Sequence, residues 1–460
     1  MALGKRKGER QLTWVAASDL PRSPGHPFYE KLNRVLAEAG FDRFVEELCA
    51  PCYAETLGAP SIPPGVYFRM LFIGYFEGLD SQRAIAWRVA DSLSLRDFLG
   101  IEPTKSTPDH SSLTRIRQRL SEEIHEAVFR KVLSMAHERK LLVGKTAAVD
   151  STLLEANAAM KSIVRKDTGE DYRTYLKRLA EEAGLKDPTS KELKRFDKNR
   201  PGKKMSNDEW QSKTDRDSRI MKMKDGRTHM SYKAEHVVDL DSEMLLGVKI
   251  YHGNAGDTKT LTESLESANE HLKSADEELS IKEVPADSGY HSVETLVACG
   301  ELGIRTYIAE SKDPKGRVWK GKPAEQEKAF RANRRRIQGK RSKKLQRLRR
   351  EKAERSFAHT CETGGARRSW LCGLTKVFKR YVIDGAGYNL GVMMRAICGI
   401  GKPRCLQGGG VFAFWGRLMG LLDRLSSHLR IPPDTQGALL ADFSPPRPMI
   451  ASPAIHLLAG

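Results

Sequence analysis

The sequence predicts a mixed α/β protein preceded by an all-helical module, and three observations support this. Apolar residues recur at helical spacing over residues 61–140, whereas from Lys145 onward they alternate with polar ones, as in strands. The strand-like segments are in turn separated by helical ones. The chain of 460 residues is also too long for one core, since length alone suggests about two to four domains. We therefore expect an N-terminal arm (1–60), a helical module (61–140), an α/β domain (141–396) and an irregular C-terminal tail (397–460).

The helical module contains three helix-like stretches. SIPPGVYFRMLFIGYFEGL starts at a Pro-Pro breaker and has a wide apolar face, and DSQRAIAWRVADSLSLRDFLG follows it. STPDHSSLTRIRQRL shows a helix start with Ser106 or Thr107 as the cap. Its three arginines, Arg115, Arg117 and Arg119, point away from the apolar side. Two readings remain open: a helix-turn-helix whose second helix enters a major groove, or a helical bundle with a solvated basic face.

The α/β domain contains five strand candidates. They are TAAVDST, the two halves of the hairpin HMSYKAEHVVDLDSEMLLGVKIYHG, IKEVPADSGY and IRTYIAE. Asp241-Ser242 makes the turn of that hairpin. HSVETLVACGELG follows the ADS segment as a helix that Gly303 terminates. In such a domain, ligands gather at the carboxyl ends of the parallel strands.

Two polar segments interrupt the α/β pattern. Residues 162–227 are rich in Lys, Asp and Glu and poor in apolar residues, which predicts an insertion or a mobile arm. Residues 312–355 contain 19 Lys or Arg against 5 Asp or Glu, an excess of 14 positive charges. Because this basic segment lies between a strand and an apolar helix, we interpret it as a phosphate-binding face and not as a solvated tail.

The charge of the whole chain points to a polyanionic partner. The formal net charge is +19 and the pI is about 9.5. A field of that sign and size favours nucleic acid over other partners.

The cysteine pattern and the absence of apolar spans predict a soluble intracellular protein. The seven cysteines are scattered, and Cys49 and Cys52 form a CxxC without a second metal-binding pair. The basic start MALGKRKGERQLTW lacks the apolar region of a signal peptide, and VFAFWGRLMGLLDRL is too short and too charged to span a bilayer. We expect no membrane association and a cytoplasmic location.

Three acidic residues are candidates for one catalytic site. Asp150 in AVDSTLLEAN and Asp287 in ADSGYHS each close a predicted strand and precede a serine. Glu354 in RREKAERSFAH lies on a predicted helix among basic residues. Carboxylates offer only hard oxygen ligands, which suit Mg²⁺ or Mn²⁺. Two such ions about 4 Å apart activate an attacking oxygen and stabilise a leaving one in phosphoryl transfer.

The order of these three motifs resembles the acidic-triad (DDE) transposases of bacterial insertion sequences. The resemblance is closest to the group that includes the IS-five and IS-eleven-eighty-two types, and it runs from about residue 60 to residue 396. PPGVYFRMLFIGYFEGL, TPDHSSLTRIRQRL and YKAEHVVDLDSEMLLGVKIYHGNAGDTKTL also carry it. Arg350 and Glu354 keep the R-x-x-x-E part of the third motif. Arg347 stands where the family has a tyrosine, and Cys361 where it has a lysine.

The resemblance implies an RNase H-like mixed sheet flanked by helices, with Asp150, Asp287 and Glu354 as catalytic residues and ligands of two Mg²⁺ or Mn²⁺ ions. It implies a transposase that binds terminal inverted repeats, cleaves phosphodiester bonds and joins 3′-OH ends to target DNA. A homodimer on paired ends and a place at the nucleoid are implied too. The expected DNA-binding residues are Arg347, Arg350, Lys352 and Arg355, with Arg115, Arg117 and Arg119 in the helical module. Two alternatives are a catalytically inactive copy that only binds DNA, and a metal-dependent nuclease without strand transfer.

Overall fold

The computed structural model describes residues 25–54, 58, 61–201, 206–310 and 319–406. The chain divides into two compact units, residues 1–403 and 404–460, and every element described below before residue 403 belongs to the first. Residues 1–24, 55–57 and 59–60 of the predicted arm, residues 312–318 of the basic segment and residues 407–460 of the predicted tail lie outside the described residues. In the described part of the chain, no helix is long and apolar enough to cross a membrane.

The N-terminal region is helical, as predicted for residues 61–140, but its first two helices lie within residues 1–60, which were predicted to be an arm. Its helices are α1 (Pro27–Glu38), α2 (Phe41–Cys49), α3 (Pro64–Glu77), α4 (Gln82–Ala90), α5 (Leu93–Phe98), α6 (His110–Arg119) and α7 (Glu122–Glu138). Helix α3 is buried along nearly its whole length, as expected for a helix that is apolar on every side. The buried Arg69 of α3 makes a bidentate ion pair with Asp42 of α2 and also donates a hydrogen bond to Asn33 of α1. It therefore connects three helices.

The start of α6 corrects the predicted cap. Asp109, and not Ser106 or Thr107, is the N-cap, because its carboxylate accepts hydrogen bonds from the backbone N–H groups of Ser111 and Ser112. Asp109 satisfies two of the N–H groups that a helix start leaves unpaired, which fixes the first turn.

Five strands form the core of the α/β region. They are β1 (Ala147–Glu155), β5 (Thr228–Asp239), β6 (Leu245–His252), β7 (Glu283–Ala286) and β8 (Arg305–Ile308). Strand β5 pairs antiparallel with β1 on one side and β6 on the other, and β7 pairs parallel with β8. A parallel bridge between Thr146 and Glu283 joins β1 to β7. The spatial order is therefore β6-β5-β1-β7-β8, which is the RNase H-like order.

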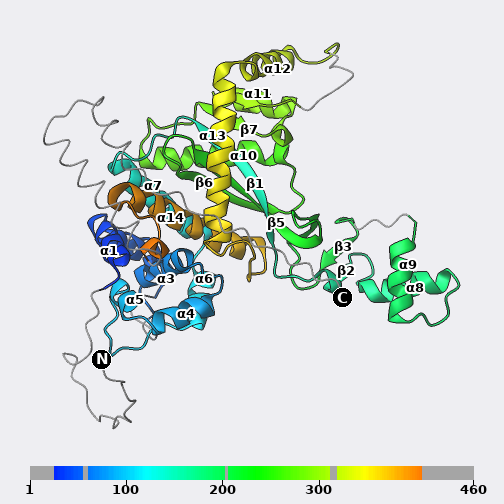
Figure 1. Cartoon of the computed structure of the whole chain (residues 1–460), viewed down its shortest axis with the longest axis horizontal. Helices are drawn as coiled ribbons and strands as arrows, with labels where there is room; N and C mark the ends of the chain where they lie inside the picture. The colour runs from blue at the N-terminus through cyan, green and yellow to red at the C-terminus, as the bar shows by residue number, and fades with distance from the viewer. Residues whose placement is uncertain (1–24, 55–57, 59–60, 202–205, 311–318, 407–460) are drawn as a thin grey trace, which may run out of the picture. The chain divides into compact units, whose positions relative to one another are not determined.

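Helices cover both faces of this sheet. Helix α13 (Lys340–Phe357) crosses the face that carries Ala148, and α14 (Leu374–Cys398) packs beside it on β6 (Figure 1). Helix α10 (Asp257–Ala275) packs on the opposite face, where Ala268 meets Gly247 of β6. The remaining helices here are α11 (Val293–Glu301) and α12 (Ala324–Ile337). Gly339 separates α12 from α13.

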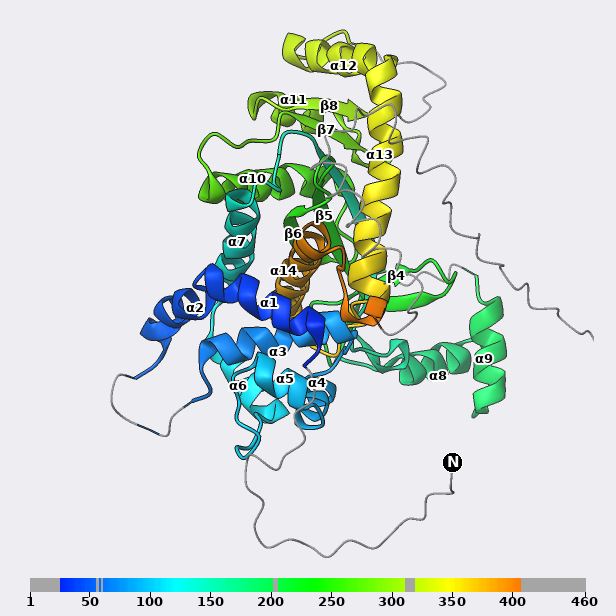
Figure 2. The same ribbon diagram turned by 60° about the vertical axis from the view of Figure 1, so that its left-hand side comes forward.

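Helix α14 joins the N-terminal helices to the sheet (Figure 2). A Cβ on Gly387 of α14 would lie 2.8 Å from the ring of Tyr75 in α3, and one on Gly385 would lie 3.2 Å from Val248 in β6. The glycines therefore allow a close approach on two sides that a larger residue would block. Asn389 of the same helix bonds both backbone groups of Leu245.

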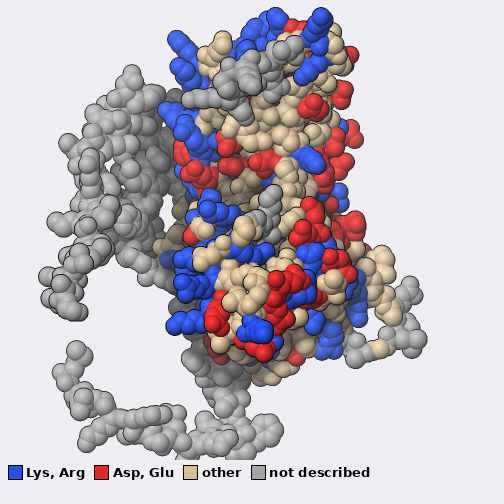
Figure 3. Space-filling model, turned by 90° about the vertical axis from the view of Figure 1, so that its right-hand side faces the viewer, with Lys and Arg blue, Asp and Glu red and all other residues tan. Residues whose placement is uncertain are grey.

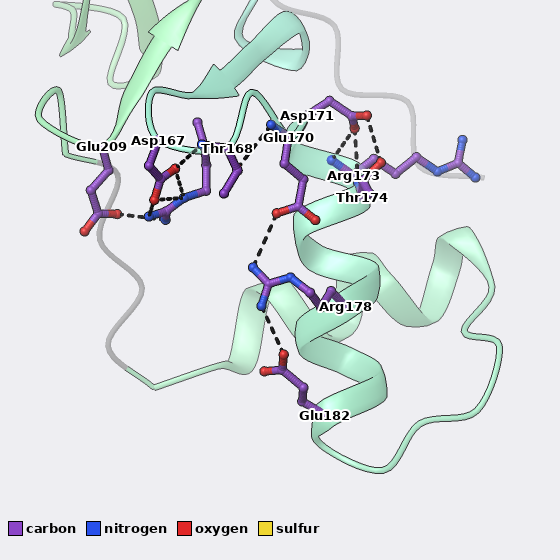
Figure 4. A network of polar contacts seen from close by, with 10 residues as sticks. Asp167, Thr168, Glu170, Asp171, Arg173, Thr174, Arg178, Glu182 and Glu209 are labelled. Carbon is purple, nitrogen blue, oxygen red and sulfur yellow. Dashed lines mark hydrogen bonds and ion pairs between the residues drawn. The ribbon is translucent and has the colours of Figure 1, made fainter.

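The polar segment 162–227 is an ordered insertion. It contains β2 (Ile163–Arg165), α8 (Tyr172–Glu182), α9 (Ser190–Asn199), β3 (Trp210–Ser212) and β4 (Arg219–Lys222), and β4 extends the main sheet along β5. Its charged residues serve local contacts: Arg178 bridges Glu170 and Glu182, and Asp171 caps α8 (Figure 4). Leu176, Ala180 and Leu193 form a small separate core.

Candidate active site

Asp150 lies within β1 and faces α13. The strand continues to Glu155, because the long β5 keeps pairing with it as far as Ser231. The prediction that Asp150 closes its strand is therefore wrong. One Asp150 oxygen accepts the backbone N–H of Ser151, and the other lies 3.2 Å from a guanidinium nitrogen of Arg349. Its side chain is 26% exposed, and burial raises its pKa in spite of Arg349.

Asp287 directly follows β7, as predicted. Its carboxylate accepts the backbone N–H of Ser288 and caps the short 3₁₀ turn η4 (Ser288–Tyr290). Its side chain is 63% exposed, and one oxygen lies 3.9 Å from the second terminal nitrogen of Arg349. Because β1 and β7 are parallel neighbours, the two aspartates meet at the same edge of the sheet.

Arg349 of α13 connects the two aspartates, and the sequence reasoning missed it. The residue is 7% exposed and also donates to the side-chain oxygen of Gln346. Gln346 in turn donates to the backbone carbonyls of Ala286 and Tyr307, so α13 is fixed to the ends of β7 and β8. The helix stripe that meets the sheet is otherwise made of small or apolar residues: Ser342, Leu345, Ala353 and Ser356. A single arginine in such a stripe was the available signal.

Glu354 is exposed on α13 and is not gathered with the aspartates. At about 100° per residue, position 354 lies roughly 140° around the helix from position 349, which occupies the face toward Asp150. Among the described residues, no group of three Asp, Glu, His or Cys side chains is placed to hold a metal ion. Three carboxylates were expected to converge. Asp150 and Asp287 lie near the same arginine, and Glu354 does not join them.

The comparison with known families decides what this site belongs to. The family described as "Transposase DDE domain" matches residues 147–382, just over half of the chain. This chain belongs to the DDE transposase family. A second family, described as "Transposase domain (DUF772)", matches residues 18–119. The transposase is thus a metal-dependent enzyme of DNA cleavage and strand transfer, as the motif order predicted.

Solved structures similar to this transposase are complexes of the Mos1 transposase. One is the "Mos1 transposase paired-end complex with left transposon end", at 10% identity, covering 68% of this chain and 82% of the other, with a TM-score of 0.18. Another is the "Mos1 mariner paired end complex with Mn", at 10% identity, covering 73% and 93%, with a TM-score of 0.19. At these scores, the strand order and the family match carry the fold assignment. No curated protein matches the chain.

The donor set of the transposase fits a divalent metal in its chemistry. Asp150 and Asp287 supply only carboxylate oxygens, which Mg²⁺ and Mn²⁺ prefer. Asp287 accepts a hydrogen bond from the backbone N–H of Ser288, and Asp150 accepts one from that of Ser151 and one from Arg349, which leaves further lone pairs on both carboxylates. Arg349 is the positive charge between them in this structure. Asp150 and Asp287 are therefore the two residues that fit a shared ion.

Of the basic residues of α13 predicted to bind DNA, two are exposed and two contact other groups of the protein. Arg347 and Arg350 are exposed on α13, on the same side as Glu354. Lys352 instead donates to the backbone carbonyl of Leu240, and Arg355 makes an ion pair with Glu243 at 2.7 Å. These two side chains anchor α13 to the β5–β6 turn, which corrects their prediction as free phosphate contacts. On the side seen in Figure 3, Lys and Arg are interspersed with Asp and Glu.

The three arginines of α6 also differ from one another. Arg115 is exposed and bonds only Ser111 of its own helix. Arg117 is 7% exposed and lines a cavity between α3, α4 and α14, so the prediction that it contacts DNA does not fit its position. Arg119 is exposed with its guanidinium 4.7 Å from the centre of the Tyr53 ring. At about 100° per residue, Arg115 and Arg119 share the exposed side of α6, whereas Arg117 lies on the opposite, buried side.

A buried polar cluster lies on the opposite face of the sheet, directly behind the aspartates. The ammonium of Lys233 lies 2.6 Å from Asp257 and 3.1 Å from Glu235, and Tyr290 donates to Glu235. The hydroxyl of Ser151 donates to Asp257. Ser151 follows Asp150, and Tyr290 belongs to the turn that Asp287 caps. The sequence reasoning missed this cluster, which links the backbone segments that carry Asp150 and Asp287.

Proposed function

We propose that this DDE transposase binds the terminal inverted repeats of an insertion sequence, hydrolyses a phosphodiester bond at each end and joins the exposed 3′-OH to target DNA. The observation that carries the proposal is the pair of aspartates on neighbouring strands, Asp150 within β1 and Asp287 directly after β7, which lie 3.2 and 3.9 Å from one arginine. The match of residues 147–382 to the transposase family supports the same reaction.

In this proposal, Asp150, Asp287 and Glu354 hold two divalent ions, Mg²⁺ or Mn²⁺. Bound ions supply activation of the attacking oxygen and charge stabilisation at the leaving oxygen. Arg349 compensates the charge of both aspartates and holds them at a fixed spacing. Glu354 is assigned from its motif with Arg350 alone, because in this structure it lies about 140° around α13 from Arg349.

The DNA contacts follow from the exposed basic residues. Arg347 and Arg350 share the exposed side of α13 with Glu354, so we assign them to phosphates near the cleaved bond. Arg115 of α6 is assigned to the repeat, because the N-terminal helices carry the remaining exposed cations of the predicted set. We assign a homodimer to the active complex, since strand transfer pairs two ends.

The test is a cleavage and joining assay with the full chain. Duplex ends taken from the DNA flanking the reading frame are incubated with the protein, Mg²⁺ and a target plasmid. Cleaved ends joined to target support the proposal. Cleavage without joining identifies a nuclease, and binding without cleavage identifies an inactive DNA-binding copy; either result overturns the proposal.

The role of Glu354 has a matched control on the same helix. We expect Glu354→Gln to lower cleavage by about 10²- to 10³-fold, the range for removing one group that stabilises developing charge. Glu351→Gln changes an equally exposed glutamate that pairs with Arg355, and it should keep the rate. Equal rates for both variants would contradict the assignment of Glu354.

A further inference from the structure

The distance between Asp150 and Asp287 is not fixed by backbone pairing between their strands. Among the described residues, β1 and β7 share one bridge, between Thr146 and Glu283, which lie four residues before Asp150 and Asp287 respectively. Glu283 donates its backbone N–H to the residue before Thr146. Pro285 is the next residue of β7 whose backbone faces β1, and it has no N–H with which to continue the pairing. Other contacts must therefore hold the two aspartates at their separation.

On the α10 face, a buried tyrosine supplies such a contact. Tyr290 closes the η4 turn, and its backbone N–H donates to the carbonyl of Asp287 at 3.1 Å. Its side chain is 1% exposed, and its hydroxyl donates to Oε2 of Glu235 at 2.9 Å. Glu235 lies on β5 directly opposite Ser151, the residue after Asp150. One side chain therefore connects the turn that begins at Asp287 to the strand pair that carries Asp150.

The acceptor of this hydrogen bond is itself held in place. Thr260 of α10 donates to the same oxygen of Glu235 at 2.8 Å, and the ammonium of Lys233 lies 3.1 Å from it. The turn is also closely packed against α10, since a Cβ on Gly289 would lie 2.7 Å from Oδ2 of Asp257. The tyrosine hydroxyl thus bonds to a fixed point of the sheet, and a buried network of this kind is rigid.

We propose that Tyr290 is a positioning residue for the two aspartates, and that its hydrogen bond to Glu235 sets the distance between the carboxylates of Asp150 and Asp287. The inference rests on the proposed function, in which both carboxylates hold divalent ions. Arg349 contacts the same pair from the α13 face, but its positive charge opposes a bound cation. Tyr290 is uncharged and acts through the backbone of Asp287, so it keeps the separation whether or not an ion is bound.

The experiment uses Tyr290→Phe in the full chain, which removes the hydroxyl and keeps the buried ring. Calorimetric titration with Mn²⁺ measures the affinity for the ion, which should fall by about 10-fold, the lower end of the range for groups that orient metal ligands. The Mn²⁺ concentration that gives half-maximal cleavage should rise by the same factor. Thermal unfolding followed by circular dichroism on the same samples measures any effect on the fold.

Tyr251→Phe is the matched control, because the hydroxyl of Tyr251 on β6 shares a hydrogen bond with Ser264 of α10 and not with the turn. It should melt close to Tyr290→Phe and keep the Mn²⁺ affinity of wild type. Equal Mn²⁺ affinity in wild type and Tyr290→Phe overturns the positioning role alone, as does an equal loss in both variants. A Tyr290→Phe chain that melts far below the control also overturns it, since the tyrosine would then support the whole fold. A wild-type chain that binds no Mn²⁺ overturns the aspartates as ion ligands, and with them both the proposed function and this inference.

Discussion

The two faces of the sheet differ at neighbouring residues of β1. Asp150 faces α13, where one arginine is its ionic partner and about a quarter of its side chain meets solvent. Ser151 faces α10, where Lys233 and Glu235 are 3% and 1% exposed and share contacts with Thr260, Asp257 and Tyr290. Both faces carry carboxylates on or beside the same strands. They differ in how far other protein groups already satisfy those carboxylates.

The comparison teaches which acids remain available for chemistry. A charge removed from water is tolerated only when partners compensate it, and once compensated it has little left to offer a substrate. Asp257 is paired with Lys233, and Oε2 of the buried Glu235 is bonded by Thr260 and Tyr290, while its Oε1 has no hydrogen-bond partner among the described residues. Asp150 and Asp287 keep open oxygens next to solvent, so the α13 face is where an ion or a DNA phosphate is able to bind.

The largest expected effect comes from removing the negative charge of Asp150 or of Asp287. Asp150→Asn and Asp287→Asn should each lower strand cleavage by about 10³-fold, the upper range for losing one group that stabilises transition-state charge. Thermal unfolding should stay within a few degrees of wild type, because neither carboxylate is consumed by the fold. A variant that keeps its cleavage rate, or that unfolds at room temperature, would contradict this division between the faces.

On the α10 face, the effect should appear in stability. Lys233→Met leaves Glu235 and Asp257 without their cation and should cost about 3–5 kcal/mol, the range for breaking a buried ion pair. Urea unfolding followed by circular dichroism measures it. Adding Glu235→Gln to Lys233→Met should recover part of the loss; a single variant as stable as wild type would show that the cluster is not essential.

Arg349→Gln tests a residue that is buried and also contacts both Asp150 and Asp287. We expect a loss of about 10- to 100-fold in cleavage, as for residues that orient metal ligands. Calorimetric titration with Mn²⁺ gives an independent measure, since the spacing of the aspartates changes when the guanidinium is lost. Arg350→Gln on the exposed side is the control and should leave Mn²⁺ binding unchanged.

The smallest expected effect concerns Glu126 of α7. Its carboxylate contacts His271 of α10 and Lys249 of β6. The hydrogen bond from His271 of α10 lowers the pKa of Glu126 to about 2 despite partial burial. A lowered pKa stabilises the fold above the usual pKa of about 4.3, and this contribution is lost as pH falls toward 2. Glu126→Gln should therefore cost on the order of 1–2 kcal/mol at pH 7, after allowing for solvent screening, and almost nothing near pH 2. Urea midpoints across this range test it, and a gap independent of pH would refute the assignment.

The sequence predicted the main arrangement of the fold for identifiable reasons. The period-two pattern around Tyr232 and the turn at Asp241-Ser242 lead directly to the β5–β6 hairpin. The repeated Asp-Ser after apolar residues placed Asp287 correctly and put Asp150 on the correct face. Asp150 was misplaced at a strand end because strand length depends on β5, whose reach cannot be read from β1 alone.

The electrostatic part of the site was less predictable. Lys352 and Arg355 looked like free cations, because Glu243 and the carbonyl of Leu240 that engage them come from more than a hundred residues earlier. Arg349 and Arg350 are adjacent in sequence, yet one is buried and the other exposed. Helical spacing places the two arginines on different sides of α13. The small and apolar residues at helical spacing from position 349 indicate which of these sides meets the sheet. Lys233 and Glu235 read as ordinary residues of a strand.

The close packing of α14 between Tyr75 and Val248 has a consequence for the reaction. Residues 1–403 form one compact unit, so the N-terminal helices and the aspartates keep a set separation. If those helices read the repeat as proposed, the protein acts as a ruler that measures a constant number of base pairs from the recognised sequence to the cut. Inserting a single base pair between the two would then move the cut into the repeat rather than carry it along.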